Sequence, residues 1–479
     1  MEEAPHRKGI LQRKMDADAA AYTSSSSFDH HIFDETVYVN IAHIRAIEKL
    51  GIISKHRADQ AVAFLATLIK SRTAIPEQVE DIHIYVESML SQRVPEVGEM
   101  LALGKSRNDA VVAAIKLKLK QKTYDLLLHL LETVKSLLER SIQDSETLFP
   151  VYTHLQRAAP ATFGFILQAY AIRLYKAVPG LSHIIEACEE SPLGSAAVAG
   201  TSVPLDRNYL ARLLGFRDIS RNALEATASR DFLLNCVSQL LIITVILSSF
   251  AEEIVLYCSE EFGLLRMPEE YAATSSIMPQ KRNPVVAEIM RTKAAEILGI
   301  LAALTGILTR QPSGYNLDLQ QTTPKLWAAI DEVESSLNLL RKMVATVEVN
   351  REKAFSACSP PTTAVEIANH LTLHYGVSFR KAHTVAGRIS RLVSANQLDE
   401  RSLKQLFEEE SVKVELDVED VLSLMDAGRT VEAYAVEGSA KSSYVAALSR
   451  KMLEEVASIS EKVVSEKERF HKTLSMLLQ

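Results

Sequence analysis

A polar segment from Ala273 to Pro284 carries the residues best suited to chemistry in this chain. It joins two apolar stretches, yet it contains hydroxyl groups, two cations and an amide. Asn283-Pro284 predicts a helix start, with Asn at the N-cap and Pro in the first turn. That arrangement would place Lys281 and Asn283 at the positive end of a helix dipole, where free backbone N–H groups bind anions. A capped loop between helices, without a ligand, is the alternative.

A second polar segment, Tyr152-Thr153-His154-Leu155-Gln156-Arg157, contains an imidazole that could transfer protons near neutral pH. A lone histidine is more often structural than catalytic, so the segment alone does not decide between these roles. We expect Pro160 to open another helix directly after it.

A third polar segment, Leu103 to Asp109, precedes a long helical pattern. Ser106 or Asn108 can cap that helix. Arg107, beside the free N–H groups of the helix start, would suit a carboxylate. Three polar helix starts suited to anions are unusual together in one helical chain.

Long helices must position these segments. Gly (17) and Pro (15) are scarce in the 479 residues, which indicates few turns and long helices. From Arg107 onward, apolar residues recur at a spacing of three to four, as at Val111, Ile115 and Leu119. The pattern predicts an all-α chain whose long central helices cover about 108–146, 160–188, 229–262, 284–309 and 325–348.

The segment Ser359-Pro360-Pro361 interrupts this pattern. Shorter helices are predicted after it, at about 363–376, 379–394, 401–410 and 417–424, with a long final helix near 441–477. We therefore predict three domains: an N-terminal helical domain (1–105), a central bundle of five long helices (106–355) and a C-terminal helical domain (356–479). Several central helices are apolar nearly all round, which favours bundles from several chains packing into a larger one.

Composition excludes several classes of function. A net charge of −7 and a pI of about 6.1 argue against a nucleic-acid or anionic-membrane surface. The stretch from Leu233 to Cys258 is apolar but interrupted by polar residues, so a buried bundle helix is favoured over a membrane span. The first 20 residues lack the apolar core of a secretory signal.

The same inspection predicts neither a metal nor a cofactor. The four cysteines are widely spaced without a CxxC pair, which argues against a zinc site or a disulfide framework and fits free thiols in the cytoplasm. The chain has no HExxH motif and no GxGxxG or Walker loop.

The polar segments resemble those of a known enzyme family. Ser275 to Pro284, SSIMPQKRNP, resembles the signature loop of the fumarase/aspartase superfamily. The wider set, collinear from about residue 25 to residue 325, is similar to argininosuccinate lyases. It comprises Glu80-Asp81-Ile82-His83, Ser106-Arg107-Asn108-Asp109, Thr153-His154-Leu155-Gln156, Ser229-Arg230-Asp231 and the run from Tyr315 to Gln320. The C-terminal third matches only as a generic helical domain.

This resemblance implies an arginine-biosynthetic lyase that eliminates fumarate from argininosuccinate. Ser275 would be the general base, although the sequence does not reveal what activates its hydroxyl. His154, paired with Glu288, would assist protonation of the departing nitrogen. Lys281 and Asn283 would stabilise the doubly charged aci-carboxylate that forms when a proton leaves the carbon next to a carboxylate.

The resemblance also implies how the substrate is held. The succinyl carboxylates would contact Ser106, Asn108 and Thr153. The amino-acid end would be held by Ser25, Asp29, Asp81, Arg230, Tyr315 and Gln320. Each active site would draw its motifs from three subunits of a homotetramer, so the implied partners are a small molecule and further copies of this chain.

Five positions depart from the pattern of the family. Thr274 stands where Gly is usual before the catalytic serine, Ala102 and Lys105 where His and Arg are usual, Val285 where Asp is usual, and Thr323 where a substrate-binding Lys is expected. These changes leave the elimination residues in place but alter the predicted leaving-group pocket.

Two other functions therefore stay open. One is a lyase for another N-substituted succinate, such as adenylosuccinate or a specialised succinyl-amine, since Lys281-Arg282-Asn283-Pro284 is locally similar to adenylosuccinate lyase. The other is a non-catalytic scaffold comparable to the lens crystallins of this superfamily. The retained residues Ser275, His154, Glu288, Lys281 and Asn283 argue against the scaffold.

Overall fold

The computed structural model describes residues 13–71, 75 and 79–479, so residues 1–12, 72–74 and 76–78 of the predicted first domain lie outside it. Its central helix is α7 (Arg107–Gln143), with 37 residues, or about 55 Å at 1.5 Å per residue. A capping box fixes where it starts: the amide of Asn108 donates to Ser106 Oγ, and the amide of Ser106 donates to Asp109 Oδ1. The helix α7 therefore sets the length of the molecule.

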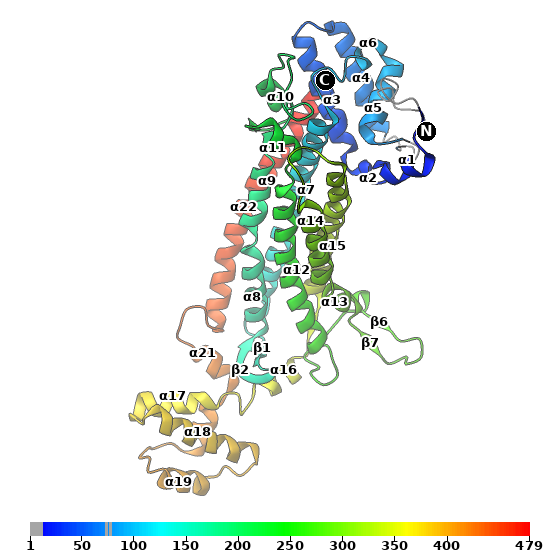
Figure 1. Ribbon diagram of the computed structural model, residues 1–479. Coiled ribbons are helices and arrows are strands. Elements are labelled where there is room, and N and C mark those ends of the chain that lie inside the picture. The colour runs from blue at the N-terminus through cyan, green and yellow to red at the C-terminus, as the bar shows by residue number, and fades with distance from the viewer. Residues whose placement is uncertain (1–12, 72–74, 76–78) are drawn as a thin grey trace.

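Other long helices pack around α7 into a rod (Figure 1). They are α8 (Phe163–Tyr175), α9 (Val178–Ala187), α12 (Asp231–Tyr257), α14 (Lys293–Leu308), α15 (Thr323–Thr346) and α22 (Ser442–Leu477). Residues at helical spacing form their shared core, as Leu130, Val134 and Leu137 do on α7. The prediction of an all-α chain built on long helices is confirmed.

Two expected helices are broken. The interval 160–188 contains the end of a β-hairpin followed by α8 and α9, and the interval 284–309 contains α13 (Val285–Met290) and α14. Pro160 does not open a helix, because it pairs with Pro150 inside the hairpin; α8 begins after the N-cap Thr162. That part of the prediction was wrong.

The N-terminal segment caps the end of the rod at which α7 begins (Figure 1). Its helices are α1 (Ala17–Thr23), α2 (Ser26–Asp29), η2 (His30–Ile32), α3 (Phe33–Lys49), α4 (Lys55–Ser71), α5 (Ile82–Arg93) and α6 (Pro95–Gly98). Helix α3 packs against α7, so residues around 25–30 and 81–83 come close to the start of α7.

The C-terminal segment divides into a small separate core and a return to the rod. Helices α17 (Ala364–Tyr375), α18 (Phe379–Ser394), α19 (Glu400–Glu409) and α20 (Val418–Leu424) share that small core. Helix α22 instead packs along α7, with Val456, Val463 and Phe470 in the main core. The division at residues 105 and 355 stays a prediction, but the segment 356–479 does not form a single core.

Short elements connect these helices. They are α10 (Arg207–Leu213), α11 (Ala223–Ala228), η3 (Glu269–Tyr271), η4 (Leu317–Thr322), α16 (Arg351–Cys358) and α21 (Ala427–Ala433). The strands of the described residues form two-stranded pairs: β1 (Leu148–Thr153) with β2 (Gln156–Thr162), β3 (Glu190–Ser191) with β4 (Asp218–Ile219), β5 (Leu265–Arg266) with β8 (Glu348–Val349), and β6 (Ala273–Thr274) with β7 (Arg282–Asn283).

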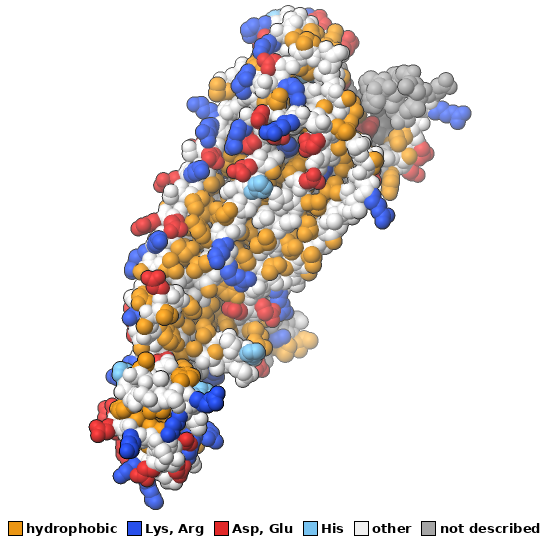
Figure 2. Space-filling view, turned by 60° about the vertical axis from the view of Figure 1, so that its left-hand side comes forward, with side chains coloured by type: hydrophobic (Ala, Val, Ile, Leu, Met, Phe, Trp, Pro, Cys, Tyr) orange, Lys and Arg blue, Asp and Glu red, His pale blue; other side chains and the backbone are white. Residues whose placement is uncertain are grey.

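Part of the surface of the rod is apolar. Figure 2 shows hydrophobic side chains along its middle and charged side chains more densely toward its ends. Ile242 and Val245 on α12 and Leu298 on α14 are about half exposed. By length and hydropathy, α12 could cross a membrane, and half of its apolar window is buried within this one chain.

Candidate active site

The start of α7 presents Ser106, Arg107 and Asn108 at one end of the rod. Asp109 Oδ2 accepts hydrogen bonds from the backbone N–H groups of Gly194 (3.1 Å) and Ala196 (2.9 Å), and burial raises the pKa of Asp109 to about 6. The side-chain amide nitrogen of Asn108 donates one of its two hydrogens to the Ala197 carbonyl at 2.9 Å. Its other hydrogen and its side-chain oxygen do not take part in this hydrogen bond. The helix start is therefore held in place before any ligand arrives.

Arg107 joins three of the residues predicted to bind the substrate. Its Nε lies 2.5 Å from Asp81 Oδ2, and its two Nη atoms donate to the Tyr315 hydroxyl and to Gln320 Oε1, both at 2.9 Å. Burial alone would raise the pKa of Asp81, but the charge of Arg107 holds it below its ordinary value. Segments more than 200 residues apart in sequence thus meet at one guanidinium.

Asp29 lies at the same place. Its Oδ2 accepts hydrogen bonds from Ser25 Oγ (2.7 Å) and from the backbone N–H of Ile82 (3.1 Å). Burial raises the pKa of Asp29 to about 6. Ser25 and Asp29, predicted for the amino-acid end of the substrate, are therefore in direct contact.

Among the described residues, Arg230 is a buried cation without a carboxylate partner. Its side chain is almost fully buried, its Nη1 donates to the carbonyls of Thr227 and Ser229, and its Nε has no hydrogen-bond partner. Burial lowers its pKa to about 10. A buried charge left unpaired costs several kcal/mol, so this arrangement points to an anionic ligand.

A small cavity of about 10 Å³, room for one water molecule, joins these residues. Its lining includes Asp29, Arg107, Arg230, Tyr315, Gln320 and Thr323. The structure thus brings together the residues predicted for the amino-acid end. It also places Thr323 beside them, where the resemblance leads one to expect a lysine.

His154 lies at the tip of the β1–β2 hairpin, at the opposite end of the rod (Figure 1). His154 and Leu155 form the two-residue turn, with φ of 56° and 57°, and Thr153 pairs with Gln156 across it. Positive φ angles suit Gly and Asn, so this turn is strained by about 1–3 kcal/mol per residue. Thr153 and His154 are exposed at this turn.

Ser275 lies in the signature loop that connects β6 to β7. Its Oγ accepts hydrogen bonds from the backbone N–H groups of Ile277 (3.2 Å) and Met278 (3.1 Å). Two such donors stabilise the ionised form of a hydroxyl more than the neutral form. Sequence reasoning left the activator of Ser275 open, and these two amides are the candidate.

The expected helix start at Asn283 was wrong. Asn283 lies in β7 and pairs with Ala273, and α13 begins at Val285 after Pro284. Because Asn283 is paired with Ala273 in the β6–β7 ladder, it does not serve as the N-cap of α13. Lys281 is exposed in the loop, and α13 has only six residues, so no long helix dipole points at Lys281 or Asn283.

The structure does not bring all the predicted catalytic residues together in one chain. Glu288 is half-buried on α13, and no hydrogen bond or ion pair joins it to His154 among the contacts of the described residues. The β6–β7 loop projects from the side of the rod (Figure 1). Ser275, His154 and Asn108 could therefore meet only if several chains supply them.

Two family models match this chain. The Lyase family model matches residues 9–299, and the Argininosuccinate lyase C-terminal model matches residues 361–432. The second match corrects the expectation that the C-terminal third is only a generic helical domain. It covers the small core formed by α17 to α20.

Curated relatives match over most of the chain. The argininosuccinate lyase of Methanothermobacter thermautotrophicus is 37% identical over 443 residues, covering 90% of this chain and 94% of that protein. That of Desulforamulus reducens is 37% identical over 385 residues, covering 79% and 84%.

Solved structures share the fold. An EDDS lyase in complex with formate superposes with a TM-score of 0.84 at 21% identity, covering 97% of this chain and 95% of that one. A class II fumarase from Schistosoma mansoni gives a TM-score of 0.71 at 17% identity, covering 88% and 96%. These likenesses, together with the family models and the curated relatives, show that the chain belongs to the argininosuccinate lyase family of the fumarase/aspartase superfamily.

Proposed function

We propose that this chain is an argininosuccinate lyase, which cleaves argininosuccinate reversibly into fumarate and arginine and so serves arginine biosynthesis. The observation that carries the assignment is the buried, unpaired guanidinium of Arg230 in a cavity that Asp29 also lines. An amino-acid leaving group has a carboxylate that can pair with Arg230 and an ammonium group that can pair with Asp29. A simple amine would leave Arg230 without an anion.

The proposed reaction starts with proton removal. Ser275 first releases its hydroxyl proton to solvent, and the amides of Ile277 and Met278 stabilise the resulting alkoxide. The alkoxide then takes the proton from the succinyl carbon next to a carboxylate. The electron pair moves into that carboxylate, which becomes the doubly charged aci-form. Lys281 and Asn283 stabilise the added charge, and such a donor is worth about 3 kcal/mol in a dry site.

The carbon–nitrogen bond breaks in the next step. The electron pair returns to form the double bond of fumarate, and the guanidino nitrogen of arginine leaves with the bonding pair. His154, oriented by Glu288 of another chain, assists its protonation. Ser106, Asn108 and Thr153 hold the two succinyl carboxylates throughout, so charge is compensated at both ends of the substrate.

We further propose a homotetramer whose active sites are each built by three chains. The separation of Asn108, His154 and the β6–β7 loop within one chain supports this arrangement. So do the half-exposed Ile242, Val245 and Leu298 on α12 and α14, because apolar surface of this kind gains free energy when another copy covers it. A cytoplasmic location is proposed as well, supported by the four free cysteine thiols.

A second candidate function is a lyase for another N-substituted succinate. Thr323 favours it, because its hydroxyl lines the leaving-group cavity where a lysine is expected. The test follows the ultraviolet absorbance of fumarate after addition of argininosuccinate, adenylosuccinate or a plain succinyl-amine. The proposal predicts turnover with argininosuccinate. Turnover with another substrate alone would select the second function, and turnover with none would favour a non-catalytic scaffold.

A further inference from the structure

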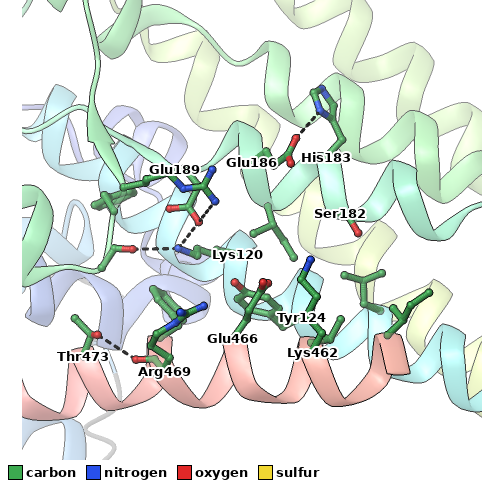
Figure 3. Close-up of a pocket in the computed structure, with 18 of the residues that line it drawn as sticks. Lys120, Tyr124, Ser182, His183, Glu186, Glu189, Lys462, Glu466, Arg469 and Thr473 are labelled. Atoms are coloured by element: carbon green, nitrogen blue, oxygen red, sulfur yellow. Dashed lines mark hydrogen bonds and ion pairs between the residues drawn. The ribbon is translucent and has the colours of Figure 1, made fainter. Parts of the chain in front are cut away.

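A hollow of about 1000 Å³ lies on the side of the rod, between α7, α9, α10 and α22. Figure 3 shows Lys120 and Tyr124 of α7 on one side of it and Lys462, Glu466 and Arg469 of α22 on the other. None of its lining residues belongs to the three segments of the candidate active site, nor to α12 or α14. The hollow is therefore separate from the proposed catalytic site and from the apolar surface proposed to join the chains.

The floor of the hollow is preorganised around Lys120. Its buried ammonium group donates to the Gly215 carbonyl (3.1 Å), pairs with Glu189 (2.8 Å) and lies 4.7 Å from the ring centre of Phe470. Gly215 has a φ of +71°, and a Cβ atom there would approach the Phe470 ring to 3.2 Å. Gly215 thus allows the backbone to turn its carbonyl toward Lys120, and the floor needs no ligand to hold its shape.

Some charges around the hollow are already neutralised by neighbours. Glu189 is paired with Lys120 and lies 3.8 Å from Arg217. Glu186 lies 3.4 Å from His183, which offsets its charge only when the imidazole is protonated. These pairs leave little net charge for a ligand.

Three other cations of the lining have no such partner. Arg212, Lys462 and Arg469 form no ion pair within the described part of the chain, and neither does Glu466. Burial also raises the pKa of Tyr124 to about 12, so its hydroxyl stays a neutral hydrogen-bond donor at neutral pH. The hollow is thus locally cationic in a chain whose net charge is −7.

We infer that this hollow binds a small polyanion through Arg212, Lys462 and Arg469, at a site distinct from the catalytic one. Phosphate and carboxylate groups share the chemistry that guanidinium and ammonium groups recognise, namely charge-assisted hydrogen bonds. The volume suits a molecule with two or three anionic groups rather than a single phosphate ion. Glu466 repels such a ligand and limits its affinity.

The test is isothermal titration of the full-length protein with pyrophosphate and, separately, with citrate. Each titration is repeated with Asn108→Ala, which removes an anion contact of the proposed catalytic site and should leave binding in the hollow unchanged. Arg469→Gln should weaken binding about tenfold, the loss of one charge-assisted hydrogen bond. Glu466→Gln should strengthen it. Lys451→Gln removes an exposed cation from the same helix outside the hollow and should leave the affinity unchanged within about twofold.

Each outcome decides the inference. Binding of pyrophosphate alone supports a phosphorylated ligand, binding of citrate alone supports a polycarboxylate, and binding of both supports the shared polyanion chemistry, provided that Arg469→Gln and Glu466→Gln act in opposite directions. Equal effects of Arg469→Gln and Lys451→Gln would show a general charge effect and overturn the site. If neither pyrophosphate nor citrate binds, the site is overturned as well.

Discussion

Asn108 and His154 lie at opposite ends of the 37-residue helix α7, with about 55 Å of helix between the two ends. The succinyl group of argininosuccinate is only a few ångströms long, so a single chain cannot place both residues on it. If one chain supplies Asn108 and another supplies His154, both residues can contact the same substrate.

The first prediction concerns the general base. Ser275→Ala should lower kcat by about 10³-fold while leaving the assembly intact, because it removes the proton acceptor and no buried contact. Ser276→Ala, in the next and more exposed position of the loop, is the matched control and should stay within about tenfold of wild type. Steady-state kinetics and size-exclusion chromatography measure both effects, and an unchanged kcat in Ser275→Ala would remove Ser275 from this role.

Substitution of Arg230 should weaken substrate binding without lowering the thermal stability of the protein. Arg230→Gln removes a buried cation that has no carboxylate partner, so the ligand-free protein should melt at the same or a higher temperature. The same variant should raise KM for argininosuccinate at least about tenfold, because the leaving-group carboxylate loses its counter-charge. Melting curves measure the change in melting temperature, and steady-state kinetics measure the change in KM. A large drop in melting temperature with an unchanged KM would make Arg230 a structural residue.

Asp29 predicts a pH dependence of stability. Its pKa is raised from 3.8 to about 6 in the folded chain, so the folded state binds the proton more tightly than the unfolded state does. Stability from this group is therefore complete below about pH 4 and is lost as the pH rises through about 6. Asp29→Asn removes that dependence.

Between pH 4 and pH 7, the free energy of unfolding of wild type should fall by about 3 kcal/mol relative to that of Asp29→Asn. Chemical unfolding of both proteins without substrate, between pH 4 and pH 7, measures the shift. A difference independent of pH would show that Asp29 has an ordinary pKa.

The hairpin turn should be more stable without its side chains. Leu155→Gly and His154→Gly each place Gly, which tolerates a positive φ angle, in the turn. Each substitution should raise the free energy of unfolding by about 1 kcal/mol and so raise the melting temperature. Only His154→Gly should lower kcat strongly, since it alone removes the imidazole. If both substitutions destabilise the protein, the turn is held by contacts that outweigh its strain.

The sequence predicts the helices well because their signal is local. Apolar spacing along α12 and α15 reports the buried face directly, and the observed bounds lie within five residues of the expected ones. The resemblance of the motifs to a known family similarly predicts the residues that surround Arg107, although they come from three separate segments of the chain. These features need no knowledge of the assembly.

The β1–β2 hairpin could not be predicted in this way. Its turn residues, His154 and Leu155, are neither Gly nor Asn, so the usual signal of a two-residue hairpin is missing. The N-cap expected at Asn283 failed for a related reason, because pairing with Ala273 outweighs the local preference of Asn-Pro. The amides that reach Ser275 depend on the loop backbone, which residue types alone do not specify.

The most direct test of the shared site mixes two inactive variants, Ser275→Ala and His154→Asn, under conditions in which exchange of subunits is verified by mass. If each site takes Ser275 and His154 from different chains, about a quarter of the sites in an equal mixture regain both native residues, and activity should recover toward a quarter of wild type. Each variant exchanged with itself is the control and should stay inactive. Complete exchange without any recovered activity would contradict the shared site and the mechanism built on it.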